Sequence, residues 1–277
     1  ALRLFDNTLL TVCVAEKGVL WVRLKASGFP GHASVPLPQS AANRLVRALS
    51  VLVDRPFPMK VTPAMRAFFT VLGQKGLSPW SARAFLRTLL ASKSLESLLL
   101  PLTLKTGSDP NALAAMLQNT VSLTRLQAGI KENVVPSHAV ADLDCRLLPG
   151  ADSDTFLESL KSRLLKKDVG HLQFEILQDQ PASESKIDSA LYQAIESTIK
   201  NHLPRARAIP FLTPGFTDAH YYRKLGMTMY GFIPMETSSG DEFVRLIHGH
   251  DERISLKNID FGVNFLMELT KHMLFKA

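Results

Sequence analysis

The stretch from residue 139 to 147 constrains the fold of this chain more than any other, because its side chains alternate strictly in polarity. One face carries apolar side chains and the other carries charged ones: Ala141, Leu143, Cys145 and Leu147 against Asp142, Asp144 and Arg146. Successive side chains of a β-strand point to opposite faces, so this pattern predicts a strand with one buried and one solvated face. Such a strand needs neighbours in a sheet and a layer that covers its apolar side.

Neighbouring segments supply the rest of that sheet and its cover. Three more strands are expected, at residues 19–26, 120–126 and 171–177. Helices are expected at residues 40–53, where apolar residues recur at helical spacing, and at residues 153–166, with Ser153 as the capping residue. Apart from one insertion, the order along the chain is β-α-β-β-α-β, which is the order of a ferredoxin-like sandwich.

The remaining segments divide the chain into two kinds of structure. Residues 59–120 contain three helix-like runs separated by glycine, serine and proline, and we expect a helical insertion that contributes packing or a wall of the substrate pocket. Residues 1–18 and 181–277 have the mixed pattern of an α/β domain, as its remnant and its C-terminal part. The expected fold class is therefore α/β, with an inserted α+β ferredoxin-like domain over residues 19–180 that carries the insertion.

The charge of the chain does not indicate a nucleic-acid partner. The formal net charge is +7 and the sequence pI is about 9.5, but the Lys and Arg residues are scattered. Their densest group, residues 161–167, fits a solvated helix face, and it lacks the interleaved aromatic residues of a nucleic-acid site. We expect a mild attraction for small anionic substrates instead.

The sequence predicts neither a membrane span nor a thiolate metal site. No apolar run reaches the roughly eighteen residues that a membrane helix needs. Cys13 and Cys145 lie in apolar runs and no Cys-x-x-Cys occurs, so both are expected to be buried hydrophobic residues. The lack of an Asn-x-Ser/Thr sequon favours an intracellular, cytoplasmic protein. The chain begins with Ala1 rather than methionine, from which we expect a processed or excised N-terminus.

Residues 248–254 form the densest group of chemically capable side chains, with two imidazoles, two carboxylates and a guanidinium. On spacing alone two interpretations are open: a charged, solvated turn, or a loop in which His248 ligates a metal and the acids orient its ring. His32 lies beside a glycine in a similar loop, and His220 follows an aspartate closely. The turn at residues 213–218 either presents backbone N–H groups to a small anion or is an ordinary Pro-Gly turn.

Six segments, taken in order, resemble those of the dinuclear-zinc peptidase family that includes aminoacylase, bacterial glutamate carboxypeptidase and succinyl-diaminopimelate desuccinylase. Within that family the chain resembles most the subgroup of carboxypeptidase S and the N-fatty-acyl-amino-acid hydrolases. The resemblance covers nearly the whole chain. The segments are Val14-Ala15-Glu16-Lys17-Gly18, Gly31-His32-Ala33-Ser34-Val35-Pro36, Gly129-Ile130-Lys131-Glu132-Asn133-Val134-Val135-Pro136, Arg146-Leu147-Leu148-Pro149-Gly150, Gly215-Phe216-Thr217-Asp218-Ala219-His220 and His248-Gly249-His250-Asp251-Glu252-Arg253-Ile254.

The resemblance implies a role for three residues near the reacting bond. His248 would be a zinc ligand of the catalytic domain, in a site that holds a pair of zinc ions in the family. His32 would sit on the ferredoxin-like lid and reach into the partner's active site of a homodimer, where it would polarise the scissile carbonyl. Asn133, also on the lid, would hydrogen-bond the substrate.

The resemblance also implies a pocket for a substrate carboxylate. Arg146 would pair with that carboxylate, and Gly215 and Thr217 would line the pocket. The expected activity is the zinc-dependent hydrolysis of an amide bond next to a free carboxylate, in small peptides or N-acyl amino acids. The expected partner is a second copy of the chain, bound through the lid.

The chain departs from the family in its metal ligands. The family's His-x-Asp motif, bridging aspartate and Glu-Glu pair do not occur in these 277 residues. We therefore expect the polypeptide alone to bind zinc weakly and to lack hydrolase activity, as a fragment, a truncated gene product or one chain of an enzyme whose N-terminal part lies elsewhere. The alternative is a catalytically dead dimerisation or interaction module derived from the family.

Overall fold

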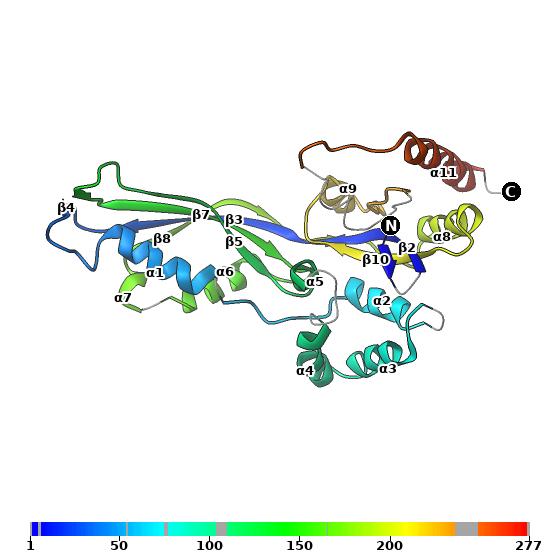
Figure 1. The fold of residues 1–277 in the computed structure, drawn as a ribbon, viewed down its shortest axis with the longest axis horizontal. Coiled ribbons are helices and arrows are strands. Elements are labelled where there is room, and N and C mark those ends of the chain that lie inside the picture. The colour runs from blue at the N-terminus through cyan, green and yellow to red at the C-terminus, as the bar shows by residue number, and fades with distance from the viewer. Residues whose placement is uncertain are drawn as a thin grey trace.

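The computed structural model describes residues 2–4, 7–53, 55–74, 77–103, 110–164, 166–235 and 249–275. Within these ranges the strands form two four-stranded sheets and one small two-stranded sheet. Figure 1 shows an elongated molecule, with one four-stranded sheet extending to the left and the other lying among helices on the right. The two large sheets give the chain two separate centres of packing.

The first sheet contains the alternating strand. Its order is β5-β7-β3-β8, and every neighbouring pair in it is antiparallel; the strands are β3 (Gly18–Ser27), β5 (Thr120–Ala128), β7 (His138–Leu147) and β8 (Leu172–Gln180). The alternation predicted for residues 139–147 is confirmed, because burial along β7 switches at every residue. On the solvated face, the Asp142 carboxylate accepts two hydrogen bonds from Arg23 of β3, at 2.7 and 3.0 Å.

Two helices, α1 (Ala41–Val53) and α6 (Ser153–Ser162), cover the apolar face of this sheet. The apolar side chains of α1 recur at helical spacing and are buried against β3 and β7. Helix α6 begins at Ser153, but the expected capping role of Ser153 is wrong by one residue, because Asp152 accepts the hydrogen bond from the Thr155 N–H at 2.8 Å. The short helix α7 (Lys166–Val169) is joined to α1 by an Arg47–Asp168 ion pair of 2.7 Å.

The second sheet has the order β1-β2-β10, with β9 also paired to β2; the strands are β1 (Leu2–Leu4), β2 (Asn7–Glu16), β9 (Ser183–Glu184) and β10 (Arg207–Thr213). Strands β2 and β10 are parallel, and the other pairs are antiparallel. Helix α2 (Pro63–Leu72) lies on one side of the sheet, and α8 (Ala190–His202) and α11 (Leu256–Leu274) lie on the other (Figure 1). This layering gives the α/β pattern expected of the outer segments.

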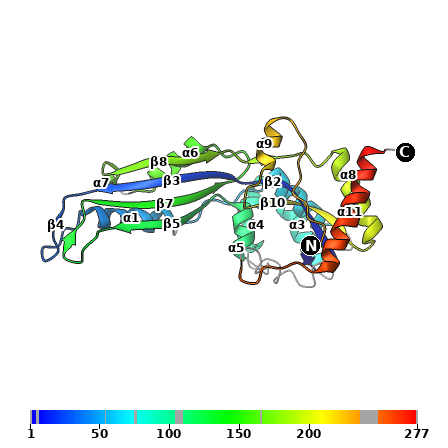
Figure 2. The same ribbon diagram turned by 90° about the horizontal axis from the view of Figure 1, so that it is seen from above.

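The helical segment between α1 and β5 packs mainly with the second sheet. It consists of α2, α3 (Trp80–Leu89), α4 (Lys93–Thr103) and α5 (Pro110–Leu117). Its buried side chains join the same core as those of β2 and β10, and Phe68 of α2 contacts Phe211 of β10 with ring centroids 6.5 Å apart. The segment is therefore inserted in sequence into the first sheet but packs with the second, as Figure 2 also shows.

The junction between the two sheets is a tight turn from β2 into β3. Lys17 lies between the two strands and is 1% exposed. Its Nζ donates hydrogen bonds to the carbonyl oxygens of Ala115 and Gln118 and to Thr120 Oγ1, at 3.0, 2.9 and 3.1 Å. A Cβ on Gly18 would lie 2.7 Å from the Ala182 nitrogen, so a side chain at residue 18 would collide with the backbone between β8 and β9. The turn therefore holds the sheets together by close backbone contact.

Among the described helices, none is long and apolar enough to cross a membrane.

Candidate active site

The candidate site lies where the parallel strands β2 and β10 end. Glu16 is the last residue of β2 and pairs in register with Thr213, the last residue of β10. In sheets with parallel strands, ligands commonly bind beyond the carboxyl ends of the strands, where the connecting loops meet. Here those loops are residues 213–218 and the turn into β3, which leads to the first sheet.

The Glu16 carboxylate is the centre of this region. It is 2% exposed, and both of its oxygens are hydrogen-bonded. Oε2 accepts from the backbone N–H and the hydroxyl of Thr217, both at 2.8 Å. Oε1 accepts from the Ser183 hydroxyl at 2.7 Å and lies 3.2 Å from Arg223 Nη1. A buried charge with this set of partners fixes the surrounding loops, because moving any one loop would leave the carboxylate undersatisfied.

The Arg223 guanidinium extends this network to further segments. Its side chain is 6% exposed, and it donates to the hydroxyls of Ser183 and Ser185 at 2.9 and 3.0 Å and to the Met229 carbonyl at 2.8 Å. Arg223 belongs to α9 (Ala219–Lys224), which follows the 213–218 turn directly. We call the Glu16 and Arg223 side chains together the junction ion pair.

The two residues predicted to line a carboxylate pocket, Gly215 and Thr217, both lie in the turn held by the junction ion pair. The backbone N–H and the hydroxyl of Thr217 both donate hydrogen bonds to the Glu16 carboxylate. Thr217 Oγ1 also accepts a hydrogen bond from the Ala219 N–H at 3.2 Å. The Gly215 N–H donates to Thr213 Oγ1 at 3.3 Å. A substrate anion would take these donors only by displacing their present acceptors.

Arg146 comes from the first sheet and meets this turn. Its guanidinium carbon lies 5.3 Å from the centre of the Phe216 ring, and its nitrogens donate to both oxygens of Asp144 at 2.6 and 2.8 Å. The structure therefore brings Arg146 together with the turn that contains Gly215 and Thr217. The guanidinium is positioned for a second anion on its side away from Asp144, since it carries five N–H donors.

His220 is buried beside the junction ion pair. It is 3% exposed, and within the described residues its Nδ1 has no hydrogen-bond partner. Burial lowers the pKa of His220, the nearby Lys224 and Arg223 lower it further, and Glu16 opposes them. The ring is therefore neutral at pH 7 and adds no charge to the site.

His32 and Asn133 meet at the far end of the first sheet. Strand β4 (Gly31–His32) pairs with β6 (Val134–Val135), and the Ala33 N–H donates to the Asn133 carbonyl at 3.0 Å. We call these paired loops the lid tip. His32 Nδ1 lies 2.7 Å from Ser34 Oγ and 3.2 Å from the Ser34 backbone nitrogen. In the tautomer that lets Nδ1 accept from both groups, the proton of the neutral ring is on Nε2. His32 is exposed, and its Nε2–H is a hydrogen-bond donor at the surface.

The lid tip is distant from the junction ion pair within one chain. Strand β3 has ten residues, and the junction and the tip lie beyond its opposite ends. At about 3.3 Å per residue, the strand alone separates them by about 30 Å. Figure 1 shows the same separation, with β4 at one end of the molecule and β10 toward the other. The structure thus assembles the predicted residues into two groups that do not meet in one chain.

The predicted metal ligand His248 lies outside the described residues. His250 and Asp251, which follow it, are exposed, and Asp251 has a φ of 58°. Among the described residues there is no group of three or more His, Cys, Asp or Glu side chains that could hold a metal ion.

Sequence reasoning missed the junction ion pair and Ser183. From the sequence, Glu16 is included only as part of a family motif. No functional role is assigned from the sequence to Arg223 or Ser183. The available signal was an acid at the end of an apolar strand, next to a Lys-Gly turn. Its partners lie 167 and 201 residues away along the chain, so no local pattern could identify them.

Comparison with known proteins relates the chain to one protein family. Residues 14–171 match the family model described as the peptidase dimerisation domain, M20_dimer. The chain is 28% identical over 267 residues to the probable carboxypeptidase S-like 2 of Dictyostelium discoideum, covering 96% of this chain and 49% of that protein. It is 26% identical over 271 residues to the human N-fatty-acyl-amino acid synthase/hydrolase PM20D1, covering 97% and 52%. The chain spans about half the length of the curated relatives it matches.

Two further comparisons agree with these. The chain is 27% identical over 264 residues to aminoacylase-1 of Pongo abelii, covering 94% of this chain and 52% of that protein. Among solved structures, the M20 family metallo-carboxypeptidase Sso-CP2 from Sulfolobus solfataricus superposes with a TM-score of 0.61 at 20% identity, covering 96% of this chain and 62% of that one. At 20% identity, this structural similarity supports the assignment of the fold and nothing further.

Proposed function

The chain belongs to the M20 peptidase family, and from this premise we propose that it is part of a hydrolase that cleaves amide bonds next to a free carboxylate. The substrate class proposed is small peptides or N-acyl amino acids, in keeping with relatives named as a carboxypeptidase, N-fatty-acyl-amino acid hydrolases and an aminoacylase. The observation that supports this most is the meeting of Arg146 with the turn at residues 215–217.

Arg146 is proposed to bind the substrate carboxylate. Its guanidinium is held by Asp144 on one side and by the Phe216 ring on another, which leaves a fixed planar donor at the carboxyl end of the parallel strands. Such a group suits bidentate recognition of a carboxylate. Gly215 and Thr217 complete the pocket by holding the turn in place, and the junction ion pair anchors that turn.

The first sheet is proposed to be a ferredoxin-like lid over residues 19–180 that pairs two chains. The strand order β8-β3-β7-β5 and the crossing helices α1 and α6 support this assignment. In the pair, the lid tip of one chain reaches the junction of the other. There the His32 Nε2–H polarises the scissile carbonyl and Asn133 binds the substrate, which is consistent with their separation of about 30 Å from the junction of their own chain.

Zinc is the metal proposed for the family site, and His248 is its one expected ligand in this sequence. Because the family's His-x-Asp motif, bridging aspartate and Glu-Glu pair do not occur in these 277 residues, we expect the polypeptide alone to bind zinc weakly and to lack hydrolase activity. Isothermal titration with zinc tests this directly. Two tight sites on the 277-residue polypeptide, or hydrolysis by it, would refute the expectation.

Ligand binding tests the proposed function without requiring turnover. N-acetyl-leucine carries the free carboxylate, and N-acetyl-leucinamide lacks it. We expect the acid to bind about ten-fold more tightly than the amide, and Arg146→Gln to remove that preference, since a charge-assisted pair contributes roughly 1.5–3 kcal/mol. Arg125→Gln, an exposed base on the same sheet, is the matched control. Equal binding of acid and amide would contradict the proposal.

The second candidate is a catalytically dead dimerisation module. It is favoured by the family model itself, which describes a dimerisation domain. A stable dimer that binds neither N-acetyl-leucine nor N-acetyl-leucinamide would support this candidate over the hydrolase.

A further inference from the structure

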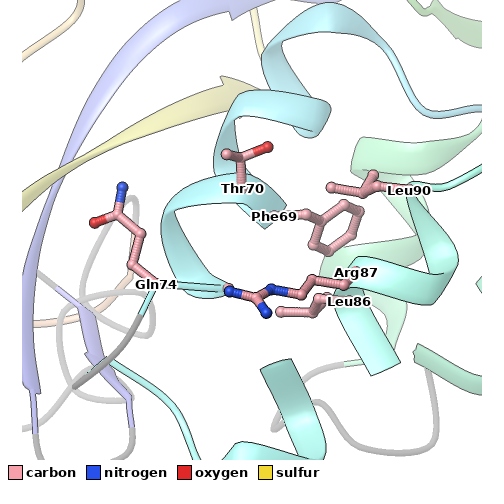
Figure 3. Close-up of a pocket in the computed structure, with 7 residues that line it drawn as sticks. Phe69, Thr70, Gln74, Leu86, Arg87 and Leu90 are labelled. Carbon is pink, nitrogen blue, oxygen red and sulfur yellow. The ribbon is translucent and has the colours of Figure 1, made fainter. Parts of the chain in front are cut away.

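A groove lies between the ends of α2 and α3, apart from both the junction and the lid tip (Figure 3). Its volume is about 500 Å³, which is within the range of small-molecule sites. The side chains that matter for its chemistry are Phe69 and Thr70 of α2 and Leu86, Arg87 and Leu90 at the end of α3. None of them takes part in the proposed reaction.

The floor of the groove is apolar. Phe69 and Leu86 are 3% and 8% exposed, and Leu90 is partly buried beside them. Gly73 at the end of α2 also lines the groove, and a Cβ there would lie 4.0 Å from the Leu86 Cβ. The lack of a side chain on Gly73 therefore leaves space open between the two helix ends. A hydrocarbon chain is the kind of group that such a floor would shield from water.

A cation lies beside this apolar floor. Figure 3 shows Arg87 extending along the groove toward Gln74. Within the described part of the chain, the Arg87 side chain forms no hydrogen bond and no ion pair. By contrast, Arg66 of α2 is paired with Glu96 and also donates to the Leu90 carbonyl at 3.2 Å. Among the described residues, therefore, no acceptor competes with an anion for the Arg87 guanidinium.

The surrounding segment strengthens the preference for an anion. Residues 59–120 contain seven Lys or Arg residues and two Asp or Glu residues. A neutral hydrocarbon in the groove would desolvate Arg87 without giving it a partner, and such burial is costly. A small inorganic anion would bind Arg87 but leave the apolar floor uncovered. The occupant that satisfies both parts carries a hydrocarbon chain and one anionic group.

We propose that the groove between α2 and α3 binds a small amphiphilic carboxylate. Its carboxylate pairs with Arg87, and its hydrocarbon chain lies over Phe69, Leu86 and Leu90. The proposal rests on the groove and its unpaired cation alone, so it does not depend on the hydrolase proposal.

Binding of octanoate tests the proposal. The control ligands are 1-octanol, which lacks the carboxylate, and acetate, which lacks the long hydrocarbon chain. Isothermal titration of the 277-residue polypeptide should give octanoate an affinity at least ten-fold above that of either control. Arg87→Gln should weaken octanoate binding about ten-fold and leave 1-octanol unchanged. Arg83→Gln removes the same charge one turn earlier on α3, at a residue that does not line the groove, and should have no effect.

A second variant tests whether the hydrocarbon chain of the ligand occupies the apolar part of the groove. Thr70 is exposed on α2, so Thr70→Trp adds a large side chain at the groove without disturbing the core. It should abolish binding of both octanoate and 1-octanol while the circular dichroism spectrum stays unchanged. The proposal is overturned if octanoate does not bind, if 1-octanol binds equally well, if Arg83→Gln weakens binding as much as Arg87→Gln, or if Thr70→Trp has no effect.

Discussion

The protonation of Lys17 makes the stability of the junction depend on pH. Burial, and to a smaller extent the charge of Arg146, lower the pKa of Lys17 from 10.5 to about 7, against an opposing effect of Asp144. After losing its proton the amine has two N–H donors, so it can keep its hydrogen bonds to the Ala115 and Gln118 carbonyls. The contact with Thr120 Oγ1, to which Nζ donates in the structure, is then kept only if the hydroxyl turns to donate to Nζ.

The magnitude follows from the two pKa values. In the unfolded chain Lys17 keeps its proton up to about pH 10.5, whereas in the folded chain it loses the proton near pH 7. Between these values the unfolded state binds more protons, so the free energy of unfolding rises with pH. At 1.36 kcal/mol per pKa unit, the contribution of Lys17 rises by roughly 3–4 kcal/mol between pH 7 and pH 10.

Lys17→Met isolates this contribution, because methionine has a similar shape and does not titrate. Urea denaturation of both proteins at pH 7, 8, 9 and 10 gives the difference in unfolding free energy, from which other titrating groups cancel. The difference should grow in favour of the wild-type protein by roughly 3–4 kcal/mol over this range. A difference that stays flat would mean that Lys17 remains charged in the folded chain, and the reasoning would be wrong.

Three further predictions concern the junction and the lid tip. Glu16→Gln should destabilise the fold by roughly 3–5 kcal/mol in urea denaturation, because it leaves the Arg223 charge buried without its partner; a loss below about 1 kcal/mol would contradict the assigned network. Gly18→Ala should lower the free energy of unfolding by roughly 1–3 kcal/mol because its Cβ would meet the Ala182 nitrogen at 2.7 Å. An unchanged melting temperature would show that the backbone near Ala182 can move aside at little cost. In the intact enzyme, His32→Ala should lower turnover far more than zinc content, measured by steady-state kinetics and metal analysis; loss of zinc instead would show that the role of His32 is misassigned.

The first sheet could be predicted from sequence because its pattern is local. Strand β7 carries a strict alternation and α1 carries an apolar stripe, so the type of each element follows from a segment of about ten residues. The predicted N-cap of α6 is wrong by one residue because Asp152 and Ser153 are both favourable capping residues. The backbone conformation, which is extended at Asp152, decides which of them caps the helix. Cys145 is fully buried as predicted, whereas Cys13 of β2 is only partly buried, so the prediction for Cys13 is wrong.

The candidate site was less predictable because its contacts are long-range. Nothing near Glu16 in sequence indicates that Thr217, Ser183 and Arg223 surround its carboxylate. Nor does the helical pattern of residues 59–120 show that these helices pack with the second sheet, since amphipathic stripes indicate burial but not the partner. The meeting of His32 with Asn133, and of Arg146 with the 215–217 turn, agrees with motif positions but was established only by the strand pairing and ring contact.

The central claim of the proposed function is that the lid tip of one chain reaches the junction of another. Chains carrying His32→Cys and chains carrying Gly215→Cys can be mixed and treated with a short bismaleimide, with each variant alone and the wild-type protein as controls for Cys13 and Cys145. The account predicts a covalent dimer that forms efficiently only in the mixture, because the two positions are about 30 Å apart within one chain. A monomer in sedimentation equilibrium, or a dimer with no cross-link between these two positions, would contradict it.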